Sequence, residues 1–327
     1  MFARCLAAIA RTSPAPEEVL VVCDGEVPEA ARLARAQGYG VIEVSGGPRG
    51  PACARNHGAR AARSPILFFV DSDVELPTTA IAQVRRHFQS DPGLTAVFGS
   101  YDAEPSDPSF LSQYRNLLHH FVHQTSSPDA STFWAGCGAI RREAFLTAQG
   151  FDESYSQPSM EDVELGYRLS RAGHRILLDK ALQAKHLKHW GLWLMLRTDV
   201  LLRAWPWAKL ILEKRNGGRD LNLRAHGRWS VLAVGALLAS LVGAVSNRLL
   251  LWPCLALAAT LLVLNMPFYR FLASKRGAVF ALRAIPVHWL YFACGGLGFS
   301  LGILSQLTAS LRGRPAAVES LGPTPTE

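Results

Sequence analysis

The chain has 327 residues, of which 49% are hydrophobic, and its formal net charge at pH 7 is +8. This length is enough for one catalytic domain and an appendage. The charge would fit a nucleic-acid-binding protein if the basic residues were spread over a soluble domain, but residues 185–228 hold ten Lys or Arg against three Asp or Glu. Nearly all of the excess therefore lies in one segment, and no nucleic-acid partner is expected.

Six cysteines are scattered along the sequence without a CxxC spacing, which indicates reduced, cytosolic thiols. No N-terminal stretch combines a charged start, an apolar core and a small-residue cleavage site. A cleaved signal peptide is therefore not expected, and membrane targeting is expected to come from the C-terminal half.

The N-terminal half alternates predicted strands with predicted helices, which favours a parallel sheet in an α/β fold. The expected elements are a strand over Glu18–Asp24, a helix over Pro28–Gln37, and strands over Tyr39–Val44 and Ile66–Val70. Ligands collect at the carboxyl ends of strands in such sheets. We therefore expect Asp24, Asp71 and Asp73 to lie together at that edge.

Asp71 and Asp73 follow a strand directly and are one residue apart. Two such carboxylates can share a divalent cation with a diphosphate, because Mg²⁺ and Mn²⁺ prefer carboxylate and phosphate oxygens. The D-x-D spacing alone is a weak signal. Upstream, residues 51–60 predict a loop that enters a helix, where Arg55 could contact a diphosphate or a base; a capped surface helix is the alternative.

A further helix is predicted to open at Ser159–Asp162 and to end at Gly173. Ser159 and Asp162 have the spacing of a capping box, so a purely structural role for these acids is one interpretation. The other is catalytic, since a carboxylate at a helix N-terminus that points into a sugar-phosphate cleft can take a proton from an acceptor hydroxyl.

Residues 188–228 are basic and rich in tryptophan. We expect them to form an interfacial collar of amphipathic helices, broken near Pro206, although a solvated basic helix pair is the alternative. Three later stretches come near the ~20 apolar residues that cross the hydrocarbon of a bilayer. They are residues 229–246, 249–268 and 285–307.

The predicted loop 269–284 carries four basic residues and no acid. By the positive-inside rule, this loop and the collar both face the cytoplasm. Three spans then place the tail, residues 312–327, on the outer side, and its Pro- and Thr-rich composition predicts disorder.

The order of the motifs is more specific than any one of them. Along the chain come Asp24-Gly25, ARNHGA (54–59), FFVDSDVELP (68–77), WAGCGAIRREAF (134–145), GFDE (150–153), MEDVELGYRLSRAGHRI (160–176) and KHLKHW (185–190). This succession resembles the family 2 glycosyltransferases of GT-A fold over residues 2–190. The resemblance implies a mixed α/β sheet with flanking helices, a nucleotide-sugar donor and a divalent metal, Mn²⁺ or Mg²⁺.

The same resemblance implies roles for individual residues. Asp24 would meet the nucleotide base, Arg55 and Asn56 would lie near the base or diphosphate, and Asp71 would approach the ribose. The implied loop that closes over the donor sugar runs from Trp134 to Gly138 and includes Gly136.

The metal and the chemistry are also assigned from the resemblance. Asp73 is expected to bind the metal. His186 stands where many relatives place a His after the last core strand, so the resemblance implies that it is a second metal ligand. Asp162 is expected to be the catalytic base, with Glu161 orienting the acceptor or the helix. The implied mechanism is a direct displacement at the anomeric carbon, which in this family commonly inverts configuration.

The sequence departs from the family pattern at three points. Relatives begin with a strand of the type V-x-V-V-I-P-x-x-N, whereas this sequence starts within the helix that should follow, so the first strand is expected to be missing. Cys23-Asp24 stands where an Asp-Asp pair is usual. The Q-x-x-R-W motif that processive polysaccharide synthases carry does not follow the Glu-Asp helix, which favours transfer of a single sugar.

We therefore expect a GT-A catalytic domain over residues 1–187, the collar over 188–228 and a membrane region over 229–311. The expected activity is transfer of one sugar to a lipid-linked or cell-envelope saccharide acceptor at the cytoplasmic face of the cell membrane. The alternative is a degenerate member of the family that acts as a membrane scaffold or binding subunit.

Overall fold

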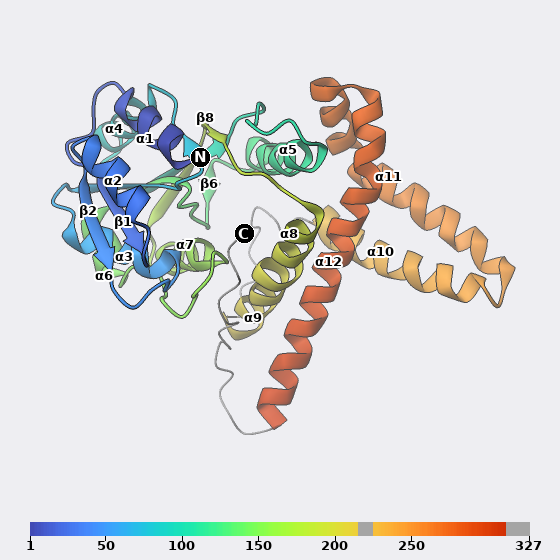
Figure 1. Ribbon diagram of the computed structural model, residues 1–327. Helices are drawn as coiled ribbons and strands as arrows, with labels where there is room; N and C mark the ends of the chain where they lie inside the picture. The colour runs from blue at the N-terminus through green and yellow to red at the C-terminus, as the bar shows by residue number, and fades with distance from the viewer. Residues whose placement is uncertain (215–224, 312–327) are drawn as a thin grey trace. The chain divides into compact units, whose positions relative to one another are not determined.

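The computed structural model describes residues 1–214 and 225–311 and contains two compact units (Figure 1). The first unit comprises residues 1–100 and 127–188 together with residues 305–311. The second comprises residues 101–126 and 189–304. The predicted tail at 312–327 lies outside the described residues.

The first unit is built from short helices and strands in the order that the sequence predicts for its first half. Its elements are α1 (Phe2–Ala10), β1 (Leu20–Asp24), α2 (Pro28–Ala36), β2 (Gly40–Val44), α3 (Pro51–Ala61), β3 (Ile66–Val70), β4 (Val74–Glu75), α4 (Ala80–Ser90), β5 (Leu94–Tyr101), β6 (Asp129–Ala130), β7 (Cys137–Arg141), α6 (Arg142–Thr147), α7 (Glu161–Arg171) and β8 (Arg175–His186). The bounds of β1, α2, β2 and β3 agree with the predicted ones to within two residues.

Two sheets form in this unit. β1 pairs in parallel with β2, as predicted. The larger sheet has the order β3-β7-β5-β8-β4, with β6 beside β8. Its pairs β3–β7, β5–β7, β4–β8 and β6–β8 are antiparallel, so the prediction of a parallel sheet is wrong there and a mixed fold results. Long connections precede β7 and β8 in the sequence. The local hydrophobic periodicity of a strand does not show in which direction it runs in the sheet.

β1 and β3 are both edge strands of their sheets. Residues 20–22 of β1 and all of β3 line a shared cavity of about 730 Å³, which α1 and α4 also border. The described residues supply no strand between these two edges.

The second unit is helical. Its elements are α5 (Phe110–Thr125), α8 (Leu192–Arg197), η1 (Thr198–Ala204), α9 (Trp205–Lys214), α10 (Ala225–Ala244), η2 (Arg248–Leu250), α11 (Leu251–Arg276) and α12 (Ala278–Leu311). Among the described residues, three segments are long and apolar enough to cross a membrane, namely His226–Ala244, Arg248–Arg276 and Ala278–Thr308.

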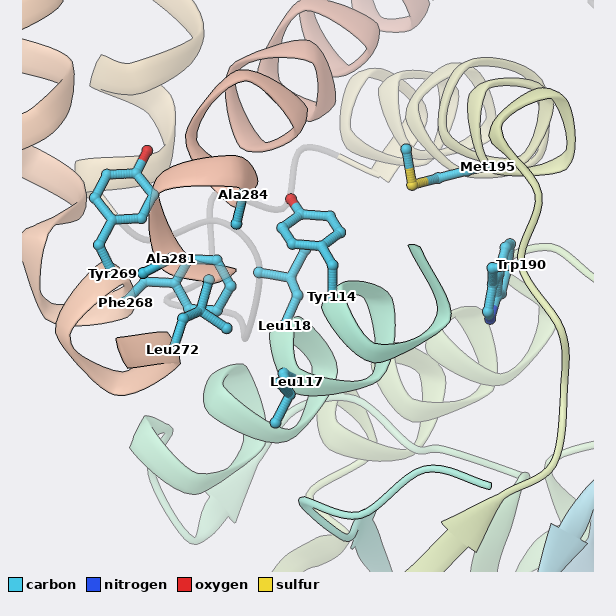
Figure 2. Packing of buried hydrophobic residues seen from close by; sticks show 10 residues of the cluster. All are labelled: Tyr114, Leu117, Leu118, Trp190, Met195, Phe268, Tyr269, Leu272, Ala281 and Ala284. Carbon is cyan, nitrogen blue, oxygen red and sulfur yellow. The ribbon is translucent and has the colours of Figure 1, made fainter. Parts of the chain in front are cut away.

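The helix α5 packs with the apolar helices of this unit. Figure 2 shows Tyr114, Leu117 and Leu118 of α5 in one buried cluster with Phe268 and Leu272 of α11. The sequence assigned residues 101–126 to the catalytic domain, whereas the structure groups them with the helical unit.

Two predicted irregularities differ in the structure. The predicted loop 269–284 is helical on both sides of Gly277, whose φ of 84° ends α11. Arg276 at that end donates to Glu104 and Gln113 of the same unit. The break expected near Pro206 is also absent, because helical backbone runs from η1, a π-helix, through Trp205 into α9.

Candidate active site

Arg55 of α3 bridges two carboxylates from distant parts of the first unit. Its Nη1 donates to Glu161 Oε1 at 2.8 Å and its Nη2 donates to Asp71 Oδ1 at 2.7 Å. The side chain is 16% exposed and lies over the ring of Phe151, 5.5 Å from its centroid. Burial lowers the pKa of Arg55, but the charges of Asp71 and Glu161 outweigh it and raise that pKa above its ordinary value. Arg55 is thus a fixed cation at the carboxyl end of β3.

Glu161 and Asp162 begin α7, but not as a capping box. The N-cap position is Met160, and it makes no side-chain cap. The backbone N–H of Ser159 donates to Glu161 Oε2 at 2.8 Å instead. The prediction of a cap formed by Ser159 and Asp162 is therefore wrong, because the helix starts two residues after Ser159.

Asp162 is held beside the loop that starts at Trp134. Its Oδ2 accepts from the backbone N–H of Ala135 at 3.3 Å, and its Oδ1 accepts from that of Val163 at 2.8 Å. Burial and the negative charge of Glu161 raise the pKa of Asp162 to about 7, although Arg55 acts in the opposite direction. A carboxyl group with this pKa can accept a proton near neutral pH and is suited to general base catalysis.

Asp73, the second acid of the D-x-D motif, lies beside His186. Asp73 Oδ2 is 3.7 Å from His186 Nε2, and the backbone N–H of Leu187 donates to the Asp73 carbonyl at 2.8 Å. The two side chains meet because Val74 of β4 pairs with His186 of β8. Burial raises the pKa of Asp73, but the neighbouring His186 and Lys188 lower it below its ordinary value.

The separation of Asp73 and His186 fits a shared divalent metal. Two ligands at about 2.1 Å from one ion are roughly 3 to 4.2 Å apart, and the Asp73–His186 distance of 3.7 Å falls in that range. Among the described residues, no group of three or more His, Cys, Asp or Glu could hold a metal. The pair therefore fits an ion whose other ligands come from diphosphate and water, as is usual for Mg²⁺. Asp71 does not share this position, since it bonds to Arg55.

Two predicted donor-binding residues make structural hydrogen bonds. Asp24 accepts from the backbone N–H groups of Arg49 and Gly50 at 2.8 and 2.7 Å and so holds the start of α3. Asn56 is 2% exposed and exchanges hydrogen bonds with the backbone of Phe151 at 2.8 and 2.9 Å. Their predicted contacts to the base or diphosphate stay predictions.

The predicted donor loop depends on its glycines. A Cβ on Gly136 would lie 2.6 Å from the indole of Trp134, and one on Gly138 would lie 2.3 Å from the Trp134 carbonyl oxygen. The carbonyl of Gly136 accepts from the backbone N–H of Asp71 at 3.1 Å. The loop is thereby joined to the end of β3, close to the Arg55 bridge.

Sequence reasoning missed the supporting roles of Phe151 and Ala135. Phe151 packs beneath Arg55 and bonds to Asn56, while Ala135 donates to Asp162. Both residues lie within motifs that the sequence singles out, GFDE and WAGCG, which was the available signal. A sequence does not show that a backbone N–H group will bond to a catalytic acid, or that an aromatic ring will pack against a cation.

Comparisons with known proteins concern the family and the fold of the chain. Residues 1–147 match the family model described as glycosyl transferase family 2. A comparison with curated proteins gave no match.

Two solved structures are among those similar to this chain. The mannosyltransferase PcManGT from Pyrobaculum calidifontis, in complex with GDP-Man and Mn²⁺, is 18% identical; the match covers 91% of this chain and 83% of that chain with a TM-score of 0.56. TarS from S. aureus, in complex with UDP-GlcNAc, is 14% identical over 96% of this chain and 88% of that chain, with a TM-score of 0.49. At such identities the likeness concerns the fold alone.

Proposed function

The chain is a glycosyltransferase of family 2 with a GT-A fold, and from this premise we propose that it transfers one sugar from a nucleotide-sugar donor to a lipid-linked or cell-envelope saccharide acceptor. The proposed reaction depends on a divalent metal and takes place at the cytoplasmic face of the membrane. The observation that carries the proposal is the Glu161–Asp162 pair, with Asp162 beside the donor loop and its pKa raised to about 7.

In the proposed reaction, Asp162 takes the proton of the acceptor hydroxyl while the hydroxyl oxygen attacks the anomeric carbon. Glu161, held by Arg55 and by the N–H of Ser159, keeps a negative charge beside Asp162 and so keeps it basic at neutral pH. Attack from the face opposite the leaving diphosphate inverts the configuration, as the family resemblance suggests.

On the donor side, Arg55 places a fixed positive charge at the end of β3, next to Asp71. Asp73 and His186 would hold a Mn²⁺ or Mg²⁺ ion, which when bound neutralises charge that develops on the departing diphosphate. The similar mannosyltransferase in complex with GDP-Man and Mn²⁺ supports this part of the proposal.

The membrane part of the proposal rests on three apolar helices and on the basic segment before them. Each helix is long enough to span a bilayer, and basic residues precede the first of them. We infer from the positive-inside rule that this basic segment faces the cytoplasm. Anchorage raises the effective concentration of membrane-bound acceptors around the catalytic unit, which favours a lipid-linked acceptor.

The test is nucleotide release by the protein in lipid nanodiscs, with a panel of UDP-, GDP- and dTDP-sugars and with Mn²⁺ or Mg²⁺. The variants are Asp162→Asn, Asp73→Asn and His186→Gln, and the matched control is Asp129→Asn, which changes an exposed carboxylate of β6. We expect metal-dependent release from one donor, normal in the control and lost in Asp162→Asn.

The metal variants separate binding from chemistry. Asp73→Asn and His186→Gln are expected to raise the metal concentration for half-maximal rate by at least about 10-fold, since loss of a residue that only supports a metal ligand already has about that effect. An unchanged metal requirement in both variants would place the ion elsewhere. Absence of turnover with every donor would contradict the proposed transfer.

A further inference from the structure

The helical unit contains a small polar cavity that the proposed reaction does not use. Its volume is about 50 Å³, and α5, η1 and α12 each contribute to its wall. The polar side chains in that wall are Arg115, His119, His123, Arg203 and Tyr291. Since a water needs roughly 10–15 Å³ of such space, the cavity has room for a few waters or for one small oxyanion.

The charges around this cavity do not balance. Arg115 is 1% exposed and donates from both terminal nitrogens to Asp199, at 3.0 and 2.5 Å, so this pair is neutral as a whole. Arg203 donates to His119 Nε2 at 2.8 Å, and no carboxylate of the described residues lies within ion-pair distance of it. Two guanidinium groups thus share one carboxylate, which leaves an excess positive charge.

Aromatic rings surround the Arg115 guanidinium group. The rings of Trp190 and Tyr291 lie 5.2 and 5.8 Å from the Arg115 guanidinium carbon. The Nε of Arg115 is buried and has no hydrogen-bond partner among the described residues. Buried donors and charges without partners are costly, and their presence beside a cavity indicates that a further group completes the site.

We propose that this cavity binds the phosphate group of a membrane lipid. A guanidinium group fits phosphate because its N–H groups lie in a plane and bond two oxygens at once, and phosphate supplies the negative charge that Arg203 lacks. Water would fill the space but would not neutralise the charge.

A lipid source is favoured over free phosphate by the elements that form the wall. Tyr291 belongs to α12, one of the three helices able to cross a membrane, and η1 lies in the basic segment before the first of them. Such juxtamembrane cations attract lipid phosphates. The proposed site lies in a different unit from Asp162, so it goes beyond the proposed transfer and does not depend on it.

Hydrogen exchange on the full chain in maltoside detergent tests the proposal. The probes are dodecyl phosphate, dodecanol as the phosphate-free control, and inorganic phosphate. Dodecyl phosphate is expected to slow exchange in peptides that cover residues 115–123 and 198–204. Dodecanol is expected to have no effect there, and inorganic phosphate to act only at much higher concentration.

Binding of dodecyl phosphate is then compared between Arg203→Gln and Arg228→Gln, which removes an exposed charge from the same basic segment. We expect the dissociation constant to rise about tenfold or more in the first variant only, because one charge-assisted contact is lost. If Arg203→Gln does not fold, the three probes on the unaltered protein decide the question.

Three results would overturn the proposal. Equal protection by dodecanol would show an alkyl-chain site, and equal potency of inorganic phosphate would show that the lipid is not the source. Unchanged exchange at 115–123 and 198–204 with every probe would show that the cavity takes no phosphate.

Discussion

Arg55 and Glu161 form a 2.8 Å ion pair across 106 residues of sequence, and it joins the start of α7 to the middle of α3. The second arm of the same guanidinium reaches Asp71 at the end of β3. Arg55 therefore connects Asp71, which is proposed to lie near the donor, with Glu161, which lies beside the proposed base Asp162. A substitution of Asp71 is therefore expected to affect the position of Glu161, and a substitution of Glu161 that of Asp71.

The first prediction concerns Arg55→Lys. Lysine keeps the charge but cannot bond both carboxylates in a planar fork, so one buried charge-assisted contact is lost. We expect nucleotide release to fall at least about tenfold and the free energy of unfolding to fall by about 2 kcal/mol. The measurements are steady-state release and thermal unfolding in detergent.

The matched control for this change is Arg60→Lys. Arg60 lies on the same helix and pairs with Glu153, but its side chain is 57% exposed, so little effect is expected. Equal losses of nucleotide release and of stability in Arg55→Lys and Arg60→Lys would show that the ion pairs of Arg55 contribute no more than that of an exposed arginine.

The second prediction is a shift in the pH profile of the reaction. Because Asp162 must be ionised to act as a base, kcat/KM is expected to rise with pH through about 7. In Glu161→Gln the neighbouring negative charge is gone, which lowers the pKa of Asp162 and moves the rising limb to lower pH.

The measurement is kcat/KM between pH 5 and 9, a range of roughly two units on each side of the expected midpoint. Glu143→Gln, which changes an exposed acid of α6, serves as the control and should leave the limb in place. A limb that stays at the same pH in Glu161→Gln would argue against Asp162 as the group that titrates.

The third prediction links the same carboxyl group to stability. The pKa of Asp162 is raised from an ordinary value of 3.8 to about 7, so the folded state binds this proton more tightly than the unfolded state. Stability is therefore lost as the pH rises from about 4 to 7. Asp162→Asn avoids burying that charge and is expected to unfold at a higher temperature than the unaltered protein at pH 8.

The gain in Asp162→Asn is expected to be about 1–3 kcal/mol at pH 8 and to shrink toward zero near pH 4. Thermal unfolding in detergent at several pH values measures it, with Asp129→Asn as the exposed control. A stability difference that does not change with pH would mean that the group titrates normally in the folded protein.

The sequence predicted the local elements of the first half of the chain well, but not how elements pair at a distance. The limits of β3 and the acids that follow it come from a short apolar run, which is a local property. The capping box at Ser159 was wrong because spacing alone does not show where α7 begins. Pairing of Asp73 with His186 was foreseen through the family resemblance, and spacing would not have found it.

The sequence also does not show which helices α5 packs against. Its buried face, with Tyr114 and Leu117, shows that it packs against something but not that its partner is α11. The cavity beside Arg203 combines residues more than 80 positions apart, so no motif marks it. Such sites are visible only when the helices are placed together.

The fourth prediction concerns the donor loop and uses Gly136→Ala. The added Cβ would lie 2.6 Å from the indole of Trp134, a side chain that can move, so the fold should survive while the indole shifts. We expect the KM for the donor to rise by about tenfold with little change in unfolding temperature. Gly191→Ala is the control, because a Cβ there meets nothing within 4 Å.

Gly138→Ala brings its Cβ to 2.3 Å from the Trp134 backbone oxygen, which cannot move aside as a side chain can, and this variant is expected to lower the unfolding temperature as well. If Gly136→Ala binds the donor normally while its indole fluorescence changes, Trp134 does not contact the donor sugar.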